Sequence, residues 1–339
     1  MRTGFVLLAL ALGACAATSP PPPSSPGDRV QPARVATPLF ELRTGFWVSL
    51  HHHLRGEARR LPVALEGKLP RDPDPATLPA DERAAWEASL TAYGRTMAKR
   101  DLLFGDEMVE IKNALADLQD ASGLSTLRGR FDDEALDALE RAAPVYRALL
   151  WPEHERKARA WIAEMSPLVA RYGPAIAPRL AALYDTSWGT IPVEVLPEAG
   201  AVDAYTSANP TRISISCQNP ELVGFPALEI LFHESSHGWD LRNPLASEAY
   251  RSGVTIPDNL WHAVLFYLAG EVVRSELERA GTPGYVLYVD AQGLWKQEWE
   301  GLREPIAAAC DPWLRGERTR AEALHAIVTA VGKPRSKES

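Results

Sequence analysis

Cysteine is scarce in this chain: 339 residues contain only three. One of them, Cys15, lies in the N-terminal segment, so only Cys217 and Cys310 are left to pair. They are far apart in the sequence, and a single pair is no disulfide framework. We therefore expect two unpaired cysteines in the folded part of the chain.

Positively charged residues are also fewer than negatively charged ones. Lysine and arginine number 36 against 44 aspartates and glutamates, which gives a net charge of −8. Because no basic run is available to bind phosphates, the sequence argues against nucleic acid as a partner. Hydrophobic residues make up 46% and charged residues 24%, which is ordinary for a soluble globular protein. The length allows one large domain or two small ones.

The chain has no long hydrophobic run. Its most apolar stretch, Phe5–Leu12, follows Arg2 and is too short to span a bilayer, which is typical of a secretory signal peptide. The stretch ends in Leu12-Gly13-Ala14-Cys15, which resembles the bacterial lipobox and predicts lipidation of Cys15. We therefore expect residues 1–15 to be a lipoprotein signal peptide.

A linker rich in proline and serine follows at residues 16–37, with SPPPPSSPGD at its centre. Such a tract cannot bury a core and acts as a semi-rigid spacer. The expected location is the bacterial cell envelope, on the outer membrane or the periplasmic face, with the membrane contacted through the lipid anchor.

The rest of the chain, residues 38–339, predicts an α+β fold that is mainly helical. In the first half, 38–188, residues such as Phe40, Phe46 and Leu50 recur at helix spacing, and the proline-rich segment Lys68–Pro79 breaks the first two helical blocks. The second half, 189–332, would hold a small sheet and the catalytic residues.

The small sheet is predicted between Ile191 and Cys217. The segments IPVEVL, AVDAYT and RISIS are short and rich in β-branched residues, which favours a hairpin or meander. Ile213 and Ile215 alternate with serines, as in a half-buried strand. Helices are then expected at about 223–239, 257–280, 291–315 and 319–331, the last with a capping box at Thr319–Glu322.

Two histidine patterns suggest metal binding. His51, His52 and His53 are consecutive, so on a helix they point 100° apart, cannot converge on one ion, and at most one faces inward. The motif HESSH is different. His233 and His237 are four residues apart on one helix face, close enough to bind one ion, and Glu234 lies beside that ion as a general base. This spacing predicts a Zn²⁺ site.

A zinc site needs a third ligand, and the pattern HExxHxxGxxH is absent because Gly238-Trp239-Asp240 follows the motif. His262 and Glu271 remain as candidates, nine residues apart and so on opposite faces of one helix. Glu271 is the only carboxylate in an apolar run, where an unpaired charge is costly, and we favour it. The alternative is a salt bridge from Glu271 to Arg274, with His262 as ligand or transition-state group.

The segments TRISIS and ALEILFHESSH, followed by DNLWHAVLFYLAGEVVR, resemble a group of uncharacterised bacterial HExxH zinc metallopeptidases of the zincin type, gluzincin-like in the expected ligand set. The resemblance covers roughly Ile191 to the C-terminus. It implies a zincin-like core with a small sheet before the metal-binding helix. It also implies a zinc-dependent hydrolase with His233, His237 and Glu234 in the standard roles.

The function that we expect is metallopeptidase cleavage of a peptide or polypeptide by a zinc-activated water. Tyr267, Tyr285, Tyr288 and His262 are candidates to stabilise the oxyanion. Two alternatives are a non-catalytic zinc-binding envelope lipoprotein and a hydrolase of a cell-wall amide.

Overall fold

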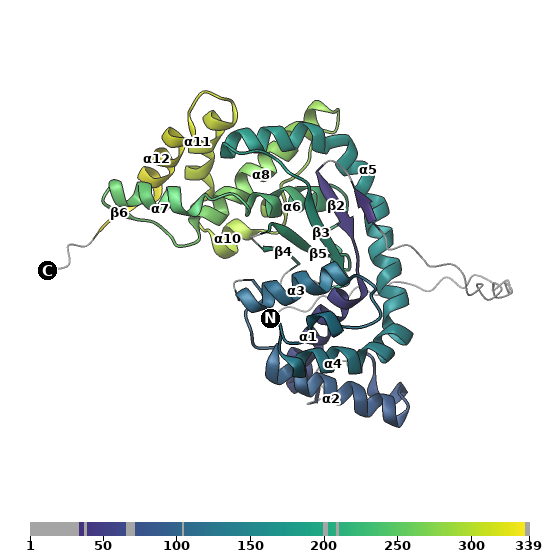
Figure 1. Cartoon of the computed structure of the whole chain (residues 1–339). Coiled ribbons are helices and arrows are strands. Elements are labelled where there is room, and N and C mark those ends of the chain that lie inside the picture. The colour runs from purple at the N-terminus through teal and green to yellow at the C-terminus, as the bar shows by residue number, and fades with distance from the viewer. Residues whose placement is uncertain are drawn as a thin grey trace, which may run out of the picture. The chain divides into compact units, whose positions relative to one another are not determined.

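Most of the described chain is helical, with one five-stranded sheet near its centre (Figure 1). The computed structural model describes residues 34–36, 39–65, 72–103, 105–198, 203–207 and 210–335. The predicted signal peptide, Cys15 and residues 16–33 of the predicted linker lie outside these residues. Strand β1 (Arg34–Ala36) lies within the segment that we predicted as linker, and it pairs with β2.

The N-terminal part is a group of helices, as expected. The proline-rich break is confirmed, because α1 ends at Leu65 and α2 begins at Ala80. A π-helical turn, Tyr146–Leu150, leads into the 34-residue helix α5, which has three prolines in its interior and bends along the molecule (Figure 1). The helices are α1 (Phe46–Leu65), α2 (Ala80–Thr96), α3 (Asp106–Leu118), α4 (Asp133–Val145) and α5 (Trp151–Tyr184).

The sheet differs from the predicted hairpin or meander. Its strand order is β1-β2-β3-β5-β4, and β3 lies parallel to both β2 and β5, while β1 and β4 are antiparallel at the two edges. Phe40, which we expected in a helix, begins β2 and pairs with Ile191, about 150 residues later. The further strands are β2 (Phe40–Arg43), β3 (Ile191–Leu196), β4 (Ala204–Ser207) and β5 (Arg212–Ser216).

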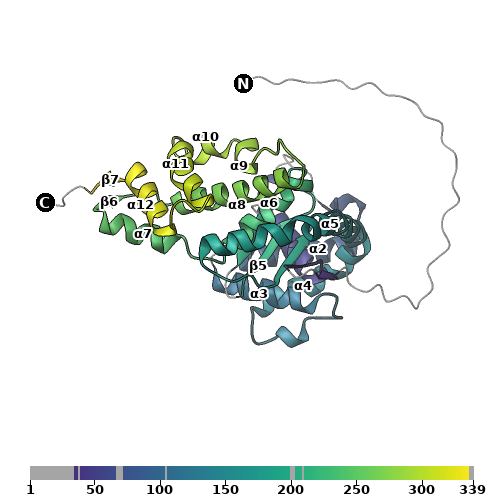
Figure 2. The same ribbon diagram turned by 90° about the horizontal axis from the view of Figure 1, so that it is seen from above.

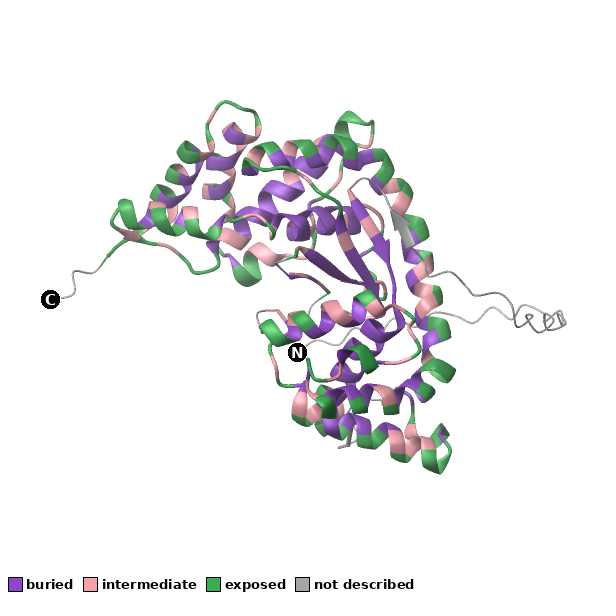
Figure 3. Ribbon diagram, viewed as in Figure 1, coloured by how far each residue is buried: buried purple, intermediate pink, exposed green. Residues whose placement is uncertain are grey.

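Strand β5 is buried along its whole length and not on alternate residues, so the expectation of a half-buried strand is wrong (Figure 3). Ile213 and Ile215 belong to a core shared with α5, α6 and α8. Tyr205, which pairs with Ser214, belongs instead to a second core among α1–α4. The serines of β5 therefore face protein and not solvent.

The C-terminal part returns to helices, which lie side by side in both views (Figures 1 and 2). The predicted helix 291–315 is interrupted, and Gly301 has φ +77 between its two pieces. The capping box of Thr319 and Glu322 is confirmed. The helices are α6 (Gly224–Ser236), α7 (Arg242–Arg251), α8 (Leu260–Arg279), α9 (Tyr288–Ala291), α10 (Leu294–Glu298), α11 (Arg303–Leu314) and α12 (Arg320–Val331), with a two-stranded ribbon of β6 (Val254–Thr255) and β7 (Lys333–Pro334).

The two cysteines of the folded part are unpaired, as expected. Cys310 is buried, whereas Cys217 is half-buried. Within the described ranges, no helix combines the length and the hydropathy needed to cross a membrane.

Candidate metal centre

Helix α6 carries the HExxH motif through the middle of the molecule. It packs against α5 and α8 and against strands β4 and β5, and every residue from Ala227 to Ser236 is buried. The apolar segment before the motif thus forms a core helix, as its composition indicated. This position fixes His233, which is 1% exposed, while His237 at the end of the helix is half-buried.

The third histidine comes from the first turn of α8, the neighbouring helix. His262 Nε2 lies 3.2 Å from His233 Nε2, and His237 Nε2 lies 3.1 Å from the same atom. Among the residues that the structure describes, these three form a group whose ligand atoms all lie within 4.8 Å of one another. We call His233, His237 and His262 the histidine cluster.

Glu271 does not belong to the histidine cluster, so the prediction that it is the third ligand is wrong. Its carboxylate forms an ion pair with Arg274, three residues later on α8. It lines a different cavity, together with Arg179 and Asp311. Glu271 and His262 face different ways, as the helical period predicts. Burial of the Glu271 carboxylate does not require a metal ion, because Arg274 provides the cationic partner.

Two of the three nitrogen spacings, those that involve His233, are close to the value for a zinc ion, and the third pair, His237 and His262, lies within 4.8 Å. Zinc–nitrogen bonds of about 2.0–2.1 Å in tetrahedral geometry put neighbouring ligand nitrogens about 3.4 Å apart. The two distances above are within a few tenths of an ångström of that value. Three imidazole nitrogens are also a ligand set that zinc accepts in catalytic sites. The residues present therefore fit the metal that the motif implies.

Burial keeps the histidine cluster neutral, which is the state that binds a metal. It lowers the pKa of His237 to about 3, with the nearby His262 as a second cause, and the pKa of His262 to about 4. Burial also lowers the pKa of His233 well below its usual value. Proton competition for these nitrogens is therefore weak at neutral pH.

Glu234 projects beside the cluster and is 6% exposed. Burial raises the pKa of its carboxyl group to about 7, although a hydrogen bond from Thr206 opposes the shift. The Thr206 hydroxyl lies 2.8 Å from Oε2 of Glu234 and 2.7 Å from its backbone oxygen. Thr206 belongs to the edge strand β4, so the sheet positions the carboxyl group. A group with a pKa near neutrality is well suited to accept and return a proton.

A cavity of about 290 Å³ adjoins the cluster. Glu234, His237 and His262 border it on one side, and Ala204, Tyr205 and Thr206 of β4 on another. Leu103 and Trp261 complete the lining and make it mainly apolar. The cluster therefore faces a space that a small group can enter.

Aromatic rings hold the imidazoles in place. Phe266 stacks on His233 with ring centroids 3.6 Å apart, and Trp261 stacks on His262 at 5.2 Å. Trp299 packs edge-on against His262. These contacts restrict the rotation of the imidazoles, so their orientation costs little when a metal binds.

Two of the three tyrosines considered as oxyanion donors are engaged elsewhere. The Tyr267 hydroxyl donates to Asp311 at 2.5 Å, and the Tyr285 hydroxyl donates to Glu229 at 2.6 Å. The Tyr288 ring stacks on Phe266, beside the histidine cluster. Tyr288 is therefore the tyrosine of the three whose ring packs next to the cluster, and its side chain also borders a second cavity together with Asp203 and Glu221.

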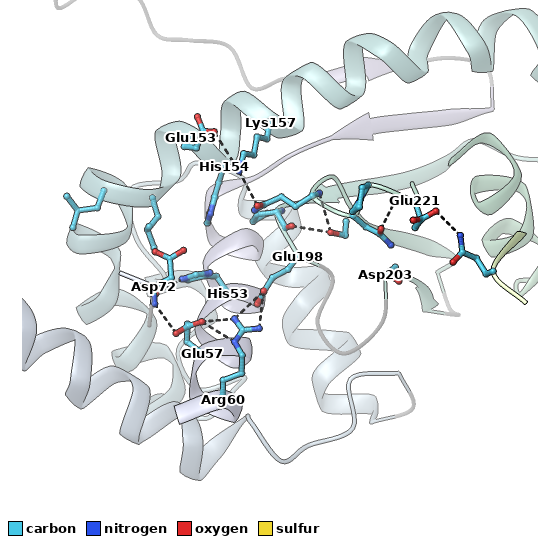
Figure 4. Close-up of a pocket in the computed structure, with 18 of the residues that line it drawn as sticks. His53, Glu57, Arg60, Asp72, Glu153, His154, Lys157, Glu198, Asp203 and Glu221 are labelled. Atoms are coloured by element: carbon cyan, nitrogen blue, oxygen red, sulfur yellow. Dashed lines mark hydrogen bonds and ion pairs between the residues drawn. The ribbon is translucent and has the colours of Figure 1, made fainter. Parts of the chain in front are cut away.

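A second and more polar cavity of about 690 Å³ is bordered by Asp203, the residue before β4, and extends towards α1 and α5 (Figure 4). Arg60 binds both Glu57 and Glu198 there, and His53 and His154 lie close together at its wall. This cavity lies outside the histidine cluster, and the sequence patterns did not indicate it.

The three consecutive histidines are all buried, so the expectation that at most one faces inward is wrong. Each has its own partner: His51 contacts the Tyr93 hydroxyl, His52 contacts Val48 O and the Tyr205 hydroxyl, and His53 contacts Asp72 O. Helix α1 is enclosed on all sides, which a local pattern does not reveal. Because the partners differ, the three rings do not converge on one point.

Comparison of the chain with protein-family models, with curated protein sequences and with solved structures finds no match in any of the three.

Proposed function

We propose that the protein is a zinc-dependent metallohydrolase with a zincin-like core, and that His233, His237 and His262 hold the metal. The convergence of three neutral imidazole nitrogens within 4.8 Å, one from a buried and two from half-buried histidines, carries this proposal. Three protein ligands beside an open cavity are typical of a catalytic zinc site, whereas a structural site is closed by a fourth ligand. The adjoining cavity therefore favours catalysis over the alternative of a non-catalytic zinc-binding protein.

When bound, a zinc ion supplies a Lewis acid that polarises a carbonyl group and acidifies water. The chain's own part in the reaction falls to Glu234. Its carboxylate accepts the proton of the attacking water and then passes that proton to the leaving amine. The Thr206 hydroxyl keeps the carboxylate oriented through both transfers. The apolar lining at Leu103 and Trp261 restricts competing water.

We propose a peptide or polypeptide as the substrate. Strand β4 is the last strand of the sheet, and its residues Ala204–Thr206 line the cavity at the cluster. An extended peptide can pair with such an edge strand and place a carbonyl group at the cluster. The lipobox at Cys15, outside the described residues, supports an envelope location and a lipid anchor, which we include in the proposal.

Zinc content and peptide cleavage test the proposal together. The purified protein is expected to contain about one zinc per chain and to cleave members of a peptide library. Glu234→Gln keeps the size of the side chain and the metal ligands but loses the base, so turnover should fall about 10²- to 10⁴-fold while zinc content is unchanged. Zinc without any cleavage would favour the non-catalytic alternative, and cleavage of cell-wall fragments alone would favour the cell-wall amide.

A further inference from the structure

Glu229 is a buried carboxylate one turn before His233 on α6, and the mechanism above does not use it. Its relative exposure is 0%. The charges that act most strongly on it are carboxylates, Asp290 and Glu271, and burial raises the pKa of Glu229 to about 7. A buried acid without a cationic partner is costly, and an apolar residue would fill the same space at lower cost. The hydrogen bonds and packing contacts of its two carboxylate oxygens show what Glu229 contributes to the structure.

Oxygen Oε2 connects α6 to the loop before α9. It accepts a hydrogen bond from the Tyr285 hydroxyl at 2.6 Å and another from the Tyr288 backbone N–H at 2.9 Å. Tyr288 is the first residue of α9, so these two bonds fix the position at which α9 begins.

Oxygen Oε1 lies against the helix that carries His262. A Cβ atom at Gly270 would lie 2.9 Å from this oxygen and 2.8 Å from Cγ of Leu287. Only glycine therefore lets α8 approach this closely, two turns beyond His262. The carboxylate thus sits where α6, α8 and the loop before α9 meet.

An aromatic stack connects this junction to the histidine cluster. The Tyr288 ring lies parallel to Phe266, with centroids 6.4 Å apart and an interplanar angle of 11°. Phe266 in turn stacks on His233 at 3.6 Å. A shift of Tyr288 would therefore be passed through Phe266 to the imidazole of His233.

We propose that Glu229 is a positioning residue, which ties the loop before α9 to α6 against Gly270 and so sets the spacing of the helices that carry His233 and His262. This role rests on the proposed metal centre. Groups that orient metal ligands typically change metal affinity about 10- to 100-fold when they are removed. Glu229 would act in this way through packing and hydrogen bonds, without contact with the ion.

Cobalt(II) is a suitable probe, because its visible absorption spectrum reports ligand geometry as well as affinity. In the full chain, Glu229→Leu should weaken cobalt binding about 10- to 100-fold and change the spectrum. Glu229→Gln keeps an oxygen acceptor for both donors, so it should stay within about threefold of the wild type. The matched control is Glu276→Leu, since Glu276 is also a buried carboxylate but is bound by Arg179 and Arg279. It should lower the melting temperature and leave cobalt binding unchanged.

A folded Glu229→Leu variant with the cobalt affinity and spectrum of the wild type would overturn the role. If that variant does not fold, Tyr285→Phe decides, because it removes one donor to Oε2 and leaves the carboxylate in place. Weaker cobalt binding with an altered spectrum then supports the role, and unchanged binding overturns it. A wild-type protein that binds no cobalt would instead overturn the metal centre itself, so the two failures are distinguishable.

Discussion

The described chain contains two groups of three histidines, one buried and the other buried or half-buried, and they differ in where their ring nitrogens point. His51–His53 are consecutive on α1, and each contacts a different hydroxyl or carbonyl group. The histidine cluster combines His233 of α6 and His237, which caps the end of α6, with one residue of α8, and the nitrogen of His233 contacts the other two. Burial is common to both groups and therefore indicates nothing about metal binding. Convergence of the nitrogens from two elements is what separates them.

The physical reason lies in helix geometry. Consecutive helical residues point in directions 100° apart, so the α1 histidines enter three different environments. Figure 4 shows one of these: His53 lies beside His154 at the wall of the polar cavity. Residues four apart share a face, and a neighbouring helix can then supply a third ligand. The first group is consequently structural, and the second can hold an ion.

The largest expected effect is on metal binding, and it sharpens this comparison. Removing one of three ligands, by His237→Ala, should lower zinc affinity by on the order of a hundredfold or more. His52→Ala removes a fully buried histidine of α1 and should leave zinc affinity unchanged. Competition titration with a coloured chelator measures both variants. Comparable losses of affinity in the two would show that the two groups do not differ as described.

The next effect is on folding stability, and here the change is expected in His52→Ala, the variant whose zinc affinity should not change. His52 bridges Val48 O and the Tyr205 hydroxyl, at 2.8 Å and 2.7 Å, and so connects α1 to β4. His52→Ala leaves a cavity and an unpaired hydroxyl, which should cost about 2–4 kcal/mol of the free energy of unfolding. Urea denaturation of metal-free protein measures this cost. A loss below about 0.5 kcal/mol would contradict a structural role for His52.

The smallest effect is a pH dependence. Burial lowers the pKa of His52 to about 3, below that of the unfolded chain. Below a pH of about 6.5 the unfolded chain binds a proton that the folded protein does not, so stability is lost as pH falls from there towards 3. His52→Gln cannot titrate, so its free energy of unfolding should fall less steeply, by at most about 1.4 kcal/mol per pH unit. Equal slopes between pH 6.5 and 5 would show that His52 is not buried in its neutral form.

Part of the candidate site could be predicted from the sequence. The HExxH spacing identified His233, Glu234 and His237, because those positions depend only on the period of one helix. The same helical period correctly placed His262 and Glu271 on different faces of α8. The choice between them depended on tertiary packing: Glu271 faces a cavity where Arg274 and Arg179 lie, whereas His262 faces α6. No local pattern reveals which side of α8 meets α6.

The sheet shows the same limit. Segments of β-branched residues correctly indicated strands between Ile191 and Cys217. Their pairing with β2 was missed, since Phe40 was assigned to a helical period and its partner Ile191 lies about 150 residues away. Parallel pairing between strands so far apart in the sequence cannot be recognised from local sequence patterns. For the same reason, nothing in the sequence indicated that β5 would be buried on both faces.

The most direct test of the central claim, that His262 completes the metal centre, is a zinc titration of two variants of α8. His262→Ala and Glu271→Ala are compared at the same pH, after circular dichroism has shown that both are folded. The structure predicts that His262→Ala lowers zinc affinity by on the order of a hundredfold or more, while Glu271→Ala binds zinc like the wild type. Zinc lost in Glu271→Ala and retained in His262→Ala would contradict the account.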